Sequence, residues 1–180
     1  MDEGIDVSVG QAVDEYMTEN GFTIAEYTAK KMTLFAGPLS FRVPNPQARQ
    51  RAVPLHDIHH VVTGFGTDVI GEGEQGIWEL RAGCPALVAI FLNSLAAAGA
   101  FILSPRRVIR AFSKAKGAST LYPVRGAPAG RESRISEESA KLMTVRELRR
   151  HLSVPESGIA ELGERRLHSH APQAELRAGV

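Results

Sequence analysis

The sequence predicts an all-α protein, a compact multi-helix bundle with a buried apolar central helix. Apolar residues recur at the three- and four-residue spacing of amphipathic helices, and two capping boxes mark helix starts. Proline and glycine separate these segments, and no stretch shows the regular alternation of a half-buried strand. With 180 residues, 43% of them hydrophobic, the chain can bury the core of one domain. We expect a single helical domain over residues 1–156 and a polar, flexible tail over residues 157–180.

The N-terminal part of the chain predicts two helices followed by a proline-rich connection. Residues 10–20 carry apolar side chains at helical spacing, and the Asn20-Gly21 pair ends that helix. The capping box that begins at Thr23 starts a second helix, which we expect to run to about Phe35. Residues 37–54 hold four prolines, so we expect a structured connection with at most one short helical turn.

The middle of the chain predicts four consecutive helices, each opened by a proline or a capping residue. Pro54 suits the first position of the first helix, because its missing N–H group costs nothing there, and Gly64 ends that helix. Thr67 or Asp68 caps the second helix. The expected ranges are residues 55–63, residues 67 or 68 to about 83, residues 86–103 and residues 106–116.

The segment 86–103 is apolar around its whole circumference. Its length approaches the roughly 20 residues needed to cross a bilayer, but Asn93 and Ser94 lie at its centre and its many alanines lower its hydrophobicity. We therefore expect this segment to be the buried central helix of the bundle. Two alternatives stay open: an element that lies against a membrane, and the wall of a cavity in which the small residues 96–100 leave room for a long apolar ligand.

The C-terminal part of the chain predicts one loop and one short helix. Residues 117–134 are rich in glycine, proline and arginine and are expected to form the loop. The capping box that begins at Thr144 starts a short helix over residues 144–152.

The composition excludes several functional classes. The net charge of +1, from 21 basic and 20 acidic residues, gives no global attraction to nucleic acid, so we expect no nucleic-acid partner. The single cysteine, Cys84, excludes a disulfide framework within the chain and any cysteine-rich zinc module. A bound metal would therefore need histidine and carboxylate ligands. The acidic start of the chain lacks the pattern of a secretory or transit peptide, which favours a cytoplasmic protein.

Metal-ligating side chains are concentrated in the segment HDIHHVVTGFGTDVIGE, residues 56–72. On a helix, His56 and His60 are neighbours one turn apart, and Asp57 lies in the same sector of about 100°. Glu72 follows a glycine-rich reversal that can bring a second helix back against the first. Two neutral imidazoles and two carboxylates would balance the charge of a divalent ion. We therefore predict a single metal site formed by these four residues.

Helix geometry leaves alternatives to this ligand set. A histidine pair on a helix is more often a surface or core feature than a metal site, and the crowding of three histidines and a carboxylate favours the metal. His59 can geometrically replace Asp57, and Glu74 or Glu79 can replace Glu72. The chain contains no H-E-x-x-H or E-x-x-H sequence, which argues against a zincin protease and a ferritin-like di-iron bundle.

The same segment resembles the H-D-x-x-H-x(11)-E signature of the coenzyme Q biosynthesis protein four family. His56, Asp57 and His60 match the first three ligand positions and Glu72 the fourth, so the resemblance favours Asp57 over His59. The similarity extends to VPNPQARQRAVPLHD before the signature and LMTVRELRRHLSVP near the end, about residues 30–156 in all. The chain reads GTDV after Phe65, where members usually read GRDP, which indicates a divergent bacterial-type member.

The resemblance implies an all-α fold, a divalent metal and an apolar site for a prenylated ligand. It implies zinc as the metal, with iron, manganese and cobalt as alternatives, and a role in ubiquinone biosynthesis. The implied reaction is an oxidative decarboxylation or hydroxylation at ring carbon C1 of a polyprenyl hydroxybenzoate, with His56, Asp57, His60 and Glu72 as the catalytic residues. Implied partners are a prenylated quinone precursor or other isoprenoid lipid, other quinone-biosynthesis enzymes, a second copy of the chain, and the inner face of the membrane.

Two other functions remain open at this point. The first is a non-catalytic prenyl-lipid-binding scaffold that organises quinone-biosynthesis enzymes around a structural metal. The second is a metal-dependent hydrolase unrelated to quinones. A site closed by four protein ligands favours the scaffold, a site with an exchangeable position favours catalysis, and a small polar pocket favours the hydrolase.

Overall fold

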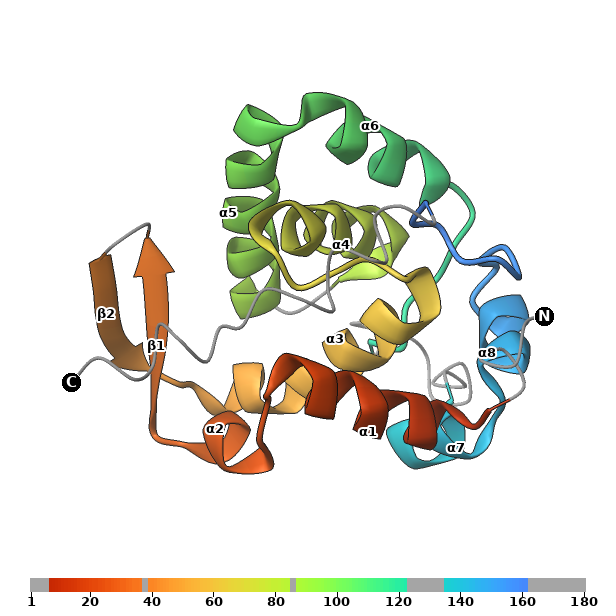
Figure 1. Cartoon of the computed structure of the whole chain (residues 1–180), viewed down its shortest axis with the longest axis horizontal. Helices are drawn as coiled ribbons and strands as arrows, with labels where there is room; N and C mark the ends of the chain where they lie inside the picture. The colour runs from red at the N-terminus through yellow and green to blue at the C-terminus, as the bar shows by residue number, and fades with distance from the viewer. Residues whose placement is uncertain (1–6, 37–38, 85–86, 123–134, 162–180) are drawn as a thin grey trace.

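The protein is a bundle of helices with one small sheet, so the expected all-α fold is confirmed (Figure 1). The computed structural model describes residues 7–36, 39–84, 87–122 and 135–161. Their elements are α1 (Val9–Asn20), α2 (Ile24–Thr28), β1 (Lys31–Ala36), β2 (Leu39–Pro44), α3 (Gln47–Thr63), α4 (Val69–Gly83), α5 (Leu87–Leu103), α6 (Pro105–Lys114), α7 (Glu137–Leu142) and α8 (Val145–His151).

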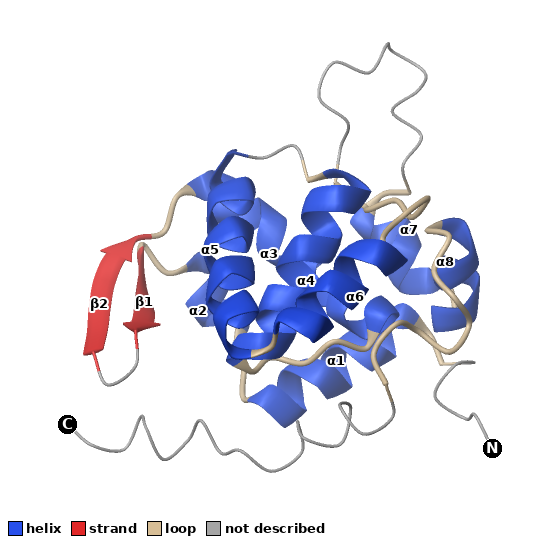
Figure 2. Cartoon of the chain, turned by 90° about the horizontal axis from the view of Figure 1, so that it is seen from above, coloured by secondary structure: helices blue, strands red, loops and turns tan. Residues whose placement is uncertain are grey.

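Helix α4 occupies the centre of the bundle, between α5, α6 and α3 (Figures 1 and 2). Its side chains Gln75, Trp78 and Glu79 have no exposed surface. Glycines let α5 approach closely: a Cβ atom at Gly76 would lie 2.8 Å from the carbonyl oxygen of Asn93, and one at Gly73 would collide with Ala100. The buried polar side chains of α4 therefore lie where they can support a site between helices.

The expectation that the apolar helix α5 is the buried centre is wrong. Its small residues Ala89, Asn93, Ala97 and Ala100 are the buried ones, whereas large apolar side chains point outward. Phe91, Leu95 and Ile102 are 66%, 60% and 83% exposed. The close packing against the glycines of α4 explains this arrangement, because only small side chains fit between the two helices. The central buried helix is the more polar α4.

A β-hairpin occupies the region where the sequence predicted a long second helix. Helix α2 ends at Thr28, and β1 and β2 then pair antiparallel, with Lys31 opposite Pro44 and Ala36 opposite Leu39. The capping box at Thr23 is present as predicted, but a cap determines where a helix starts and not how long it is. The apolar and polar residues of β2 do alternate, which is the overlooked signal of a strand.

Helix α3 starts seven residues before Pro54, the predicted first position of this helix. It begins at Gln47 after Pro46, and Pro54 lies within it. The intervening residues, QARQRAV, are mostly good helix formers, and Pro54 removes only one intrahelical donor. The helix ends at Gly64 as predicted, where a φ of 80° suits glycine and its N–H group donates to the carbonyl oxygen of His60.

The remaining predictions differ in outcome. The helices expected from Asp68, Pro105 and Thr144 are confirmed as α4, α6 and α8, whereas α7 was not predicted. Residues 117–122 are irregular, as expected, and residues 123–134 lie outside the described residues.

The packed core extends past the expected boundary at residue 156. Ile159 and Ala160 are buried, and the N–H group of Ile159 donates to the carbonyl oxygen of Thr63 at 2.7 Å. The rest of the predicted tail, residues 162–180, lies outside the described residues. Across the described part of the chain, no helix combines the length and hydrophobicity needed to span a membrane.

Candidate metal centre

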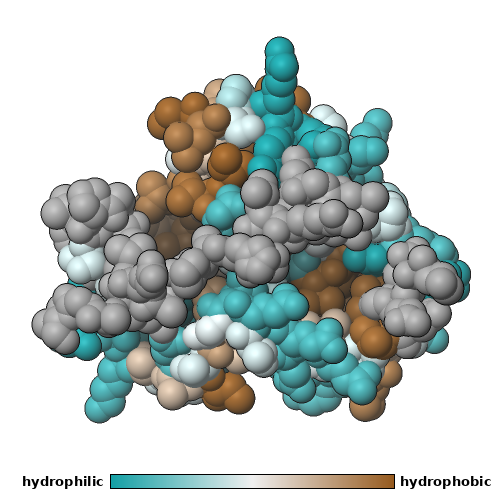
Figure 3. Space-filling model, viewed as in Figure 1, coloured by the Kyte–Doolittle hydropathy of each residue, from teal (hydrophilic) through white to brown (hydrophobic). Residues whose placement is uncertain are grey.

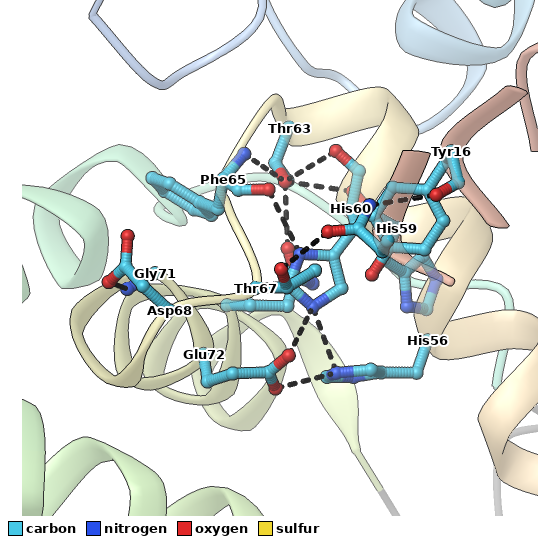
Figure 4. Close-up of polar contacts among 12 residues, drawn as sticks. Tyr16, His56, His59, His60, Thr63, Phe65, Thr67, Asp68, Gly71 and Glu72 are labelled. Atoms are coloured by element: carbon cyan, nitrogen blue, oxygen red, sulfur yellow. Dashed lines mark hydrogen bonds and ion pairs between the residues drawn. The ribbon is translucent and has the colours of Figure 1, made fainter. Parts of the chain in front are cut away.

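Three side chains from two helices converge on one point (Figure 4). His56 and His60 extend from consecutive turns of α3, and Glu72 extends from the first turn of α4. His56 Nε2 lies 3.0 Å from His60 Nε2 and 3.3 Å from Glu72 Oε2, and His60 Nε2 lies 3.6 Å from Glu72 Oε1. One potential ligand atom of each residue lies within 4.8 Å of those of the other two.

These separations fit the ligand shell of a small divalent ion. Metal–nitrogen and metal–oxygen bonds of about 2.0–2.2 Å at tetrahedral angles place neighbouring ligand atoms about 3.3 Å apart. The two Nε2 atoms are 3.0 Å apart, and they lie 3.3 and 3.6 Å from the two oxygens of Glu72, close to that value. One ligand atom of each residue lies within 4.8 Å of the other two, so an ion could bind between them after small side-chain movements.

Both histidine rings are held with their Nε2 atoms facing the convergence point. The Nδ1–H group of His60 donates to the carbonyl oxygen of Phe65 at 3.0 Å, and the Nδ1–H group of His56 donates to Glu79 Oε1 at 3.0 Å. In neutral rings with these tautomers, both Nε2 atoms carry lone pairs. Two lone pairs facing each other across 3.0 Å repel unless a cation, either a proton or a metal ion, lies between them.

The surrounding charges favour such a cation. Burial alone would lower the pKa of His56, but the carboxylates of Glu79 and Glu72 outweigh that effect and raise its pKa well above the ordinary value. Burial would raise the pKa of Glu72, but His60 and His56 outweigh it and lower this pKa to about 2. Glu72 is thus ionised at physiological pH, and its negative charge favours a cation between the two Nε2 atoms.

The loop between α3 and α4 determines the position of Glu72. Gly64 ends α3, and Asp68 caps α4 by accepting hydrogen bonds from the N–H groups of Ile70 and Gly71 at 2.7 and 2.9 Å. The two helices are therefore joined by a short reversal that brings Glu72, in the first turn of α4, beside His56 and His60 of α3 (Figure 4).

Helix α1 supports the site from the other side. The ring of Tyr16 stacks on that of His60, with centroids 5.6 Å apart, and the Thr67 hydroxyl donates to Asn20 Oδ1 at 2.6 Å. A small cleft of about 210 Å³ lies between α1 and the loop after α3, and His60 is one of its lining residues. Glu15, Glu19 and Asn20 make part of its wall polar.

The structure does not bring Asp57 into the three-ligand group. This side chain is buried, and its Oδ2 atom forms no hydrogen bond of normal geometry with any described residue. The Tyr27 hydroxyl lies beside it and interacts with this carboxylate, although no hydrogen bond of normal geometry joins the two. Burial raises the pKa of Asp57 above its usual value. Among the described residues, the group that could hold a metal ion consists of His56, His60 and Glu72, and Asp57 is not part of it.

The alternative ligands have other partners. His59 Nδ1–H donates to Glu79 Oε1 at 2.7 Å, and its Nε2 atom accepts from the N–H group of Leu121 at 2.9 Å, so both ring nitrogens are occupied. Glu74 pairs with Arg107 and Arg110 at 2.6 and 3.0 Å. Glu79 contacts His56 through the ring nitrogen that faces away from the convergence point.

Two groups that orient the histidine rings are not predictable from the residue pattern. The Phe65 carbonyl belongs to the backbone, so no residue pattern reveals it. Glu79 was considered only as a substitute for Glu72, and its actual role beside His56 depends on how α4 packs across α3.

Comparisons with protein-family models, curated proteins and solved structures find no match for this chain. The resemblance to the coenzyme Q biosynthesis protein four family therefore rests on the residues of the sequence alone.

Proposed function

We propose that this protein binds one divalent metal ion through His56, His60 and Glu72 and acts on a prenylated quinone precursor. The observation that carries the metal site is the pair of inward-facing Nε2 atoms, 3.0 Å apart, beside an ionised carboxylate. The quinone part of the proposal is supported by the signature in residues 56–72.

The number of ligands favours an enzyme over a scaffold. Structural zinc sites usually have four protein ligands, whereas catalytic sites have three and keep a position for water or substrate. Here three side chains converge, and the Glu72 side chain is 37% exposed, so the site has an open side. Iron, manganese or cobalt would supply redox chemistry with dioxygen when bound, whereas zinc would only polarise and orient a substrate oxygen.

The protein's own residues would then position the substrate. Arg49, on the first turn of α3, is partly buried within electrostatic reach of Asp57 and Glu72. Its guanidinium is a candidate partner for the carboxylate of a hydroxybenzoate ring. The Asp57 and Tyr27 oxygens, buried beside it, are candidate partners for the ring hydroxyl.

A second candidate, metal-dependent hydrolysis of a small polar substrate, is favoured by the cleft beside His60. That cleft is small and partly lined by carboxylates, whereas a prenylated ligand needs a long apolar groove. Aerobic incubation with a short-chain prenyl hydroxybenzoate separates the two candidates, since only the first releases carbon dioxide from that compound.

We also propose that the protein associates peripherally with a membrane through an α5–α6 apolar face. This face consists of Phe91, Leu95, Phe101, Ile102, Leu103, Ile109 and Phe112, all at least 43% exposed. Figure 3 shows apolar side chains gathered over α5 and its turn into α6. Residues 80–131 contain eight Arg or Lys and no Asp or Glu, so anionic lipid head groups would be attracted to the same part of the chain.

The metal site is tested by elemental analysis of the purified wild-type protein and a Glu72→Gln variant. We expect about one equivalent of a divalent metal in the wild type and a large loss in the variant, because removing one of three ligands leaves too few. Glu72 is partly exposed, so the variant should still fold. Equal metal content in the two proteins would contradict the site.

A further inference from the structure

The buried carboxylate of Glu79 lies one imidazole ring away from the proposed metal position. It has no exposed surface, and its Oε1 atom accepts from His56 Nδ1–H at 3.0 Å. That bond lies on the far side of the ring from the Nε2 atom that faces Glu72. Glu79 can therefore act on the metal only through His56.

Donors from three other parts of the chain hold this carboxylate in place. His59 of α3 donates at 2.7 Å, Asn93 of α5 at 2.7 Å, and the Tyr122 hydroxyl, after α6, at 3.2 Å. Gln75, one turn earlier on α4, adds a donor at 3.3 Å. A carboxylate that accepts this many hydrogen bonds is stabilised in its deprotonated form. The network therefore favours a charged Glu79 in a fixed orientation.

We infer that Glu79 is the positioning carboxylate of the metal centre. It fixes the Nδ1–H tautomer of His56, directs Nε2 toward the metal position and makes that nitrogen a stronger ligand. With Glu72 it also supplies the two negative charges that balance a divalent ion bound by two neutral imidazoles. The sequence assigned that second charge to Asp57, which lies outside the ligand group. This inference rests on the proposed metal site.

The same network explains why His59 is not a ligand. Its two ring nitrogens link Glu79 to the backbone N–H group of Leu121, so it contributes by holding Glu79 and the residue 117–122 segment together. His59, which helix geometry allowed as an alternative ligand, is thus part of the support for His56.

The test compares Glu79→Gln with Glu74→Gln, using Co²⁺ as the probe metal. Both glutamates are on α4, have no exposed surface and lose one charge in the variant, but Glu74 pairs with arginines of α6 and does not contact the histidines. We expect Glu79→Gln to weaken Co²⁺ and Zn²⁺ binding by about 10- to 100-fold. We also expect it to shift the ligand-field absorption of bound Co²⁺. Glu74→Gln should lower thermal stability while leaving metal affinity and the Co²⁺ spectrum close to wild type.

The possible outcomes distinguish a failure of the positioning role of Glu79 from a failure of the proposed metal site. Wild-type protein that does not bind Co²⁺ or Zn²⁺ would overturn the proposed function. Wild-type binding with an unchanged affinity and spectrum in Glu79→Gln, or an equal loss in Glu74→Gln, would overturn only the positioning role. If Glu79→Gln does not fold, Glu79→Asp and Glu74→Asp replace the pair. Because Asp is one methylene shorter, only Glu79→Asp should then weaken metal binding. A metal affinity of Glu79→Asp equal to that of the wild type would overturn the inference.

Discussion

At the scale of single residues, the ring nitrogens of three neighbouring histidines have different roles. His56 and His60 direct Nε2 toward Glu72, because their Nδ1–H groups are bound to Glu79 and to the Phe65 carbonyl. His59 has no nitrogen left for a metal. Hydrogen bonds on the outer side of each ring therefore determine which histidines can be ligands.

The sequence signature and the structure give Asp57 different roles, and a substitution of this residue can test which role is correct. The signature makes Asp57 a ligand, whereas the structure leaves its carboxylate outside the ligand group. We expect Asp57→Asn to retain metal affinity within a few-fold, because the variant keeps the side-chain shape and all three ligands. Chelator competition with Zn²⁺ measures the affinity, and Glu72→Gln serves as the positive control. A loss in Asp57→Asn as large as that in Glu72→Gln would show that Asp57 binds the metal.

At the scale of elements, the close contact between α4 and α5 places the charged groups of the site. Gly73 and Gly76 let the two backbones approach, and this brings Asn93 to within 2.7 Å of Glu79. The same contact turns the large apolar residues of α5 outward. The close contact between α4 and α5 thus positions the residues that support His56 and also leaves an apolar surface on α5.

The contact can be tested with a pair of glycine substitutions. We expect Gly76→Ala to destabilise the fold by about 1–3 kcal/mol, because its Cβ atom would lie 2.8 Å from the Asn93 carbonyl oxygen and force the helices apart. Gly99→Ala is the control: apart from its own helix backbone, no atom of the described residues lies within 4 Å of its Cβ position, and alanine in a helix is favoured by roughly 0.5–1 kcal/mol. Urea unfolding of both variants measures the difference. Equal stability in the two would contradict the close packing.

At the scale of the whole molecule, the metal centre is in the interior and the α5–α6 apolar face is on the surface. Burial of a large apolar side chain yields about 1.5–3 kcal/mol, so several of them entering a bilayer would give measurable binding. The segment 80–131, which contains basic residues and no Asp or Glu, adds a preference for anionic lipids.

The membrane proposal is tested by co-sedimentation with vesicles. We expect the protein to bind vesicles that contain phosphatidylglycerol more strongly than those of phosphatidylcholine alone, and the Leu95→Ser/Ile102→Ser double variant to bind weakly. Ile24→Ser/Leu142→Ser is the matched control, because these residues are also highly exposed but lie on α2 and α7. Equal binding of the two double variants would contradict the proposal. Loss of a dimer in light scattering, without loss of vesicle binding, would indicate that a second copy covers the face.

Local signals in the sequence were sufficient for part of the fold and part of the site. The caps at Asp68 and Thr144 gave the starts of two helices, because each side chain bonds to the backbone within its own turn. The one-turn spacing of His56 and His60 placed both on one side of α3 for the same reason. The segment after Thr28 was misread, because a helix and a strand compete there and pairing with the adjacent strand β2 decides between them.

Two features follow from the amino-acid sequence alone: the chain is helical, and His56, His60 and Glu72 can meet. Short-range backbone geometry is enough for both conclusions, since a helical turn and a brief reversal connect the three residues. Which residues support the site and which helix is buried depend on how the helices pack. Glu79, Asn93 and Tyr122 come from segments far apart in the chain, so their contacts depend on how the helices pack. The burial of α4 instead of α5 likewise follows from the close contacts that the glycines of α4 make with α5. The average hydrophobicity of a segment carries no information about such contacts between helices.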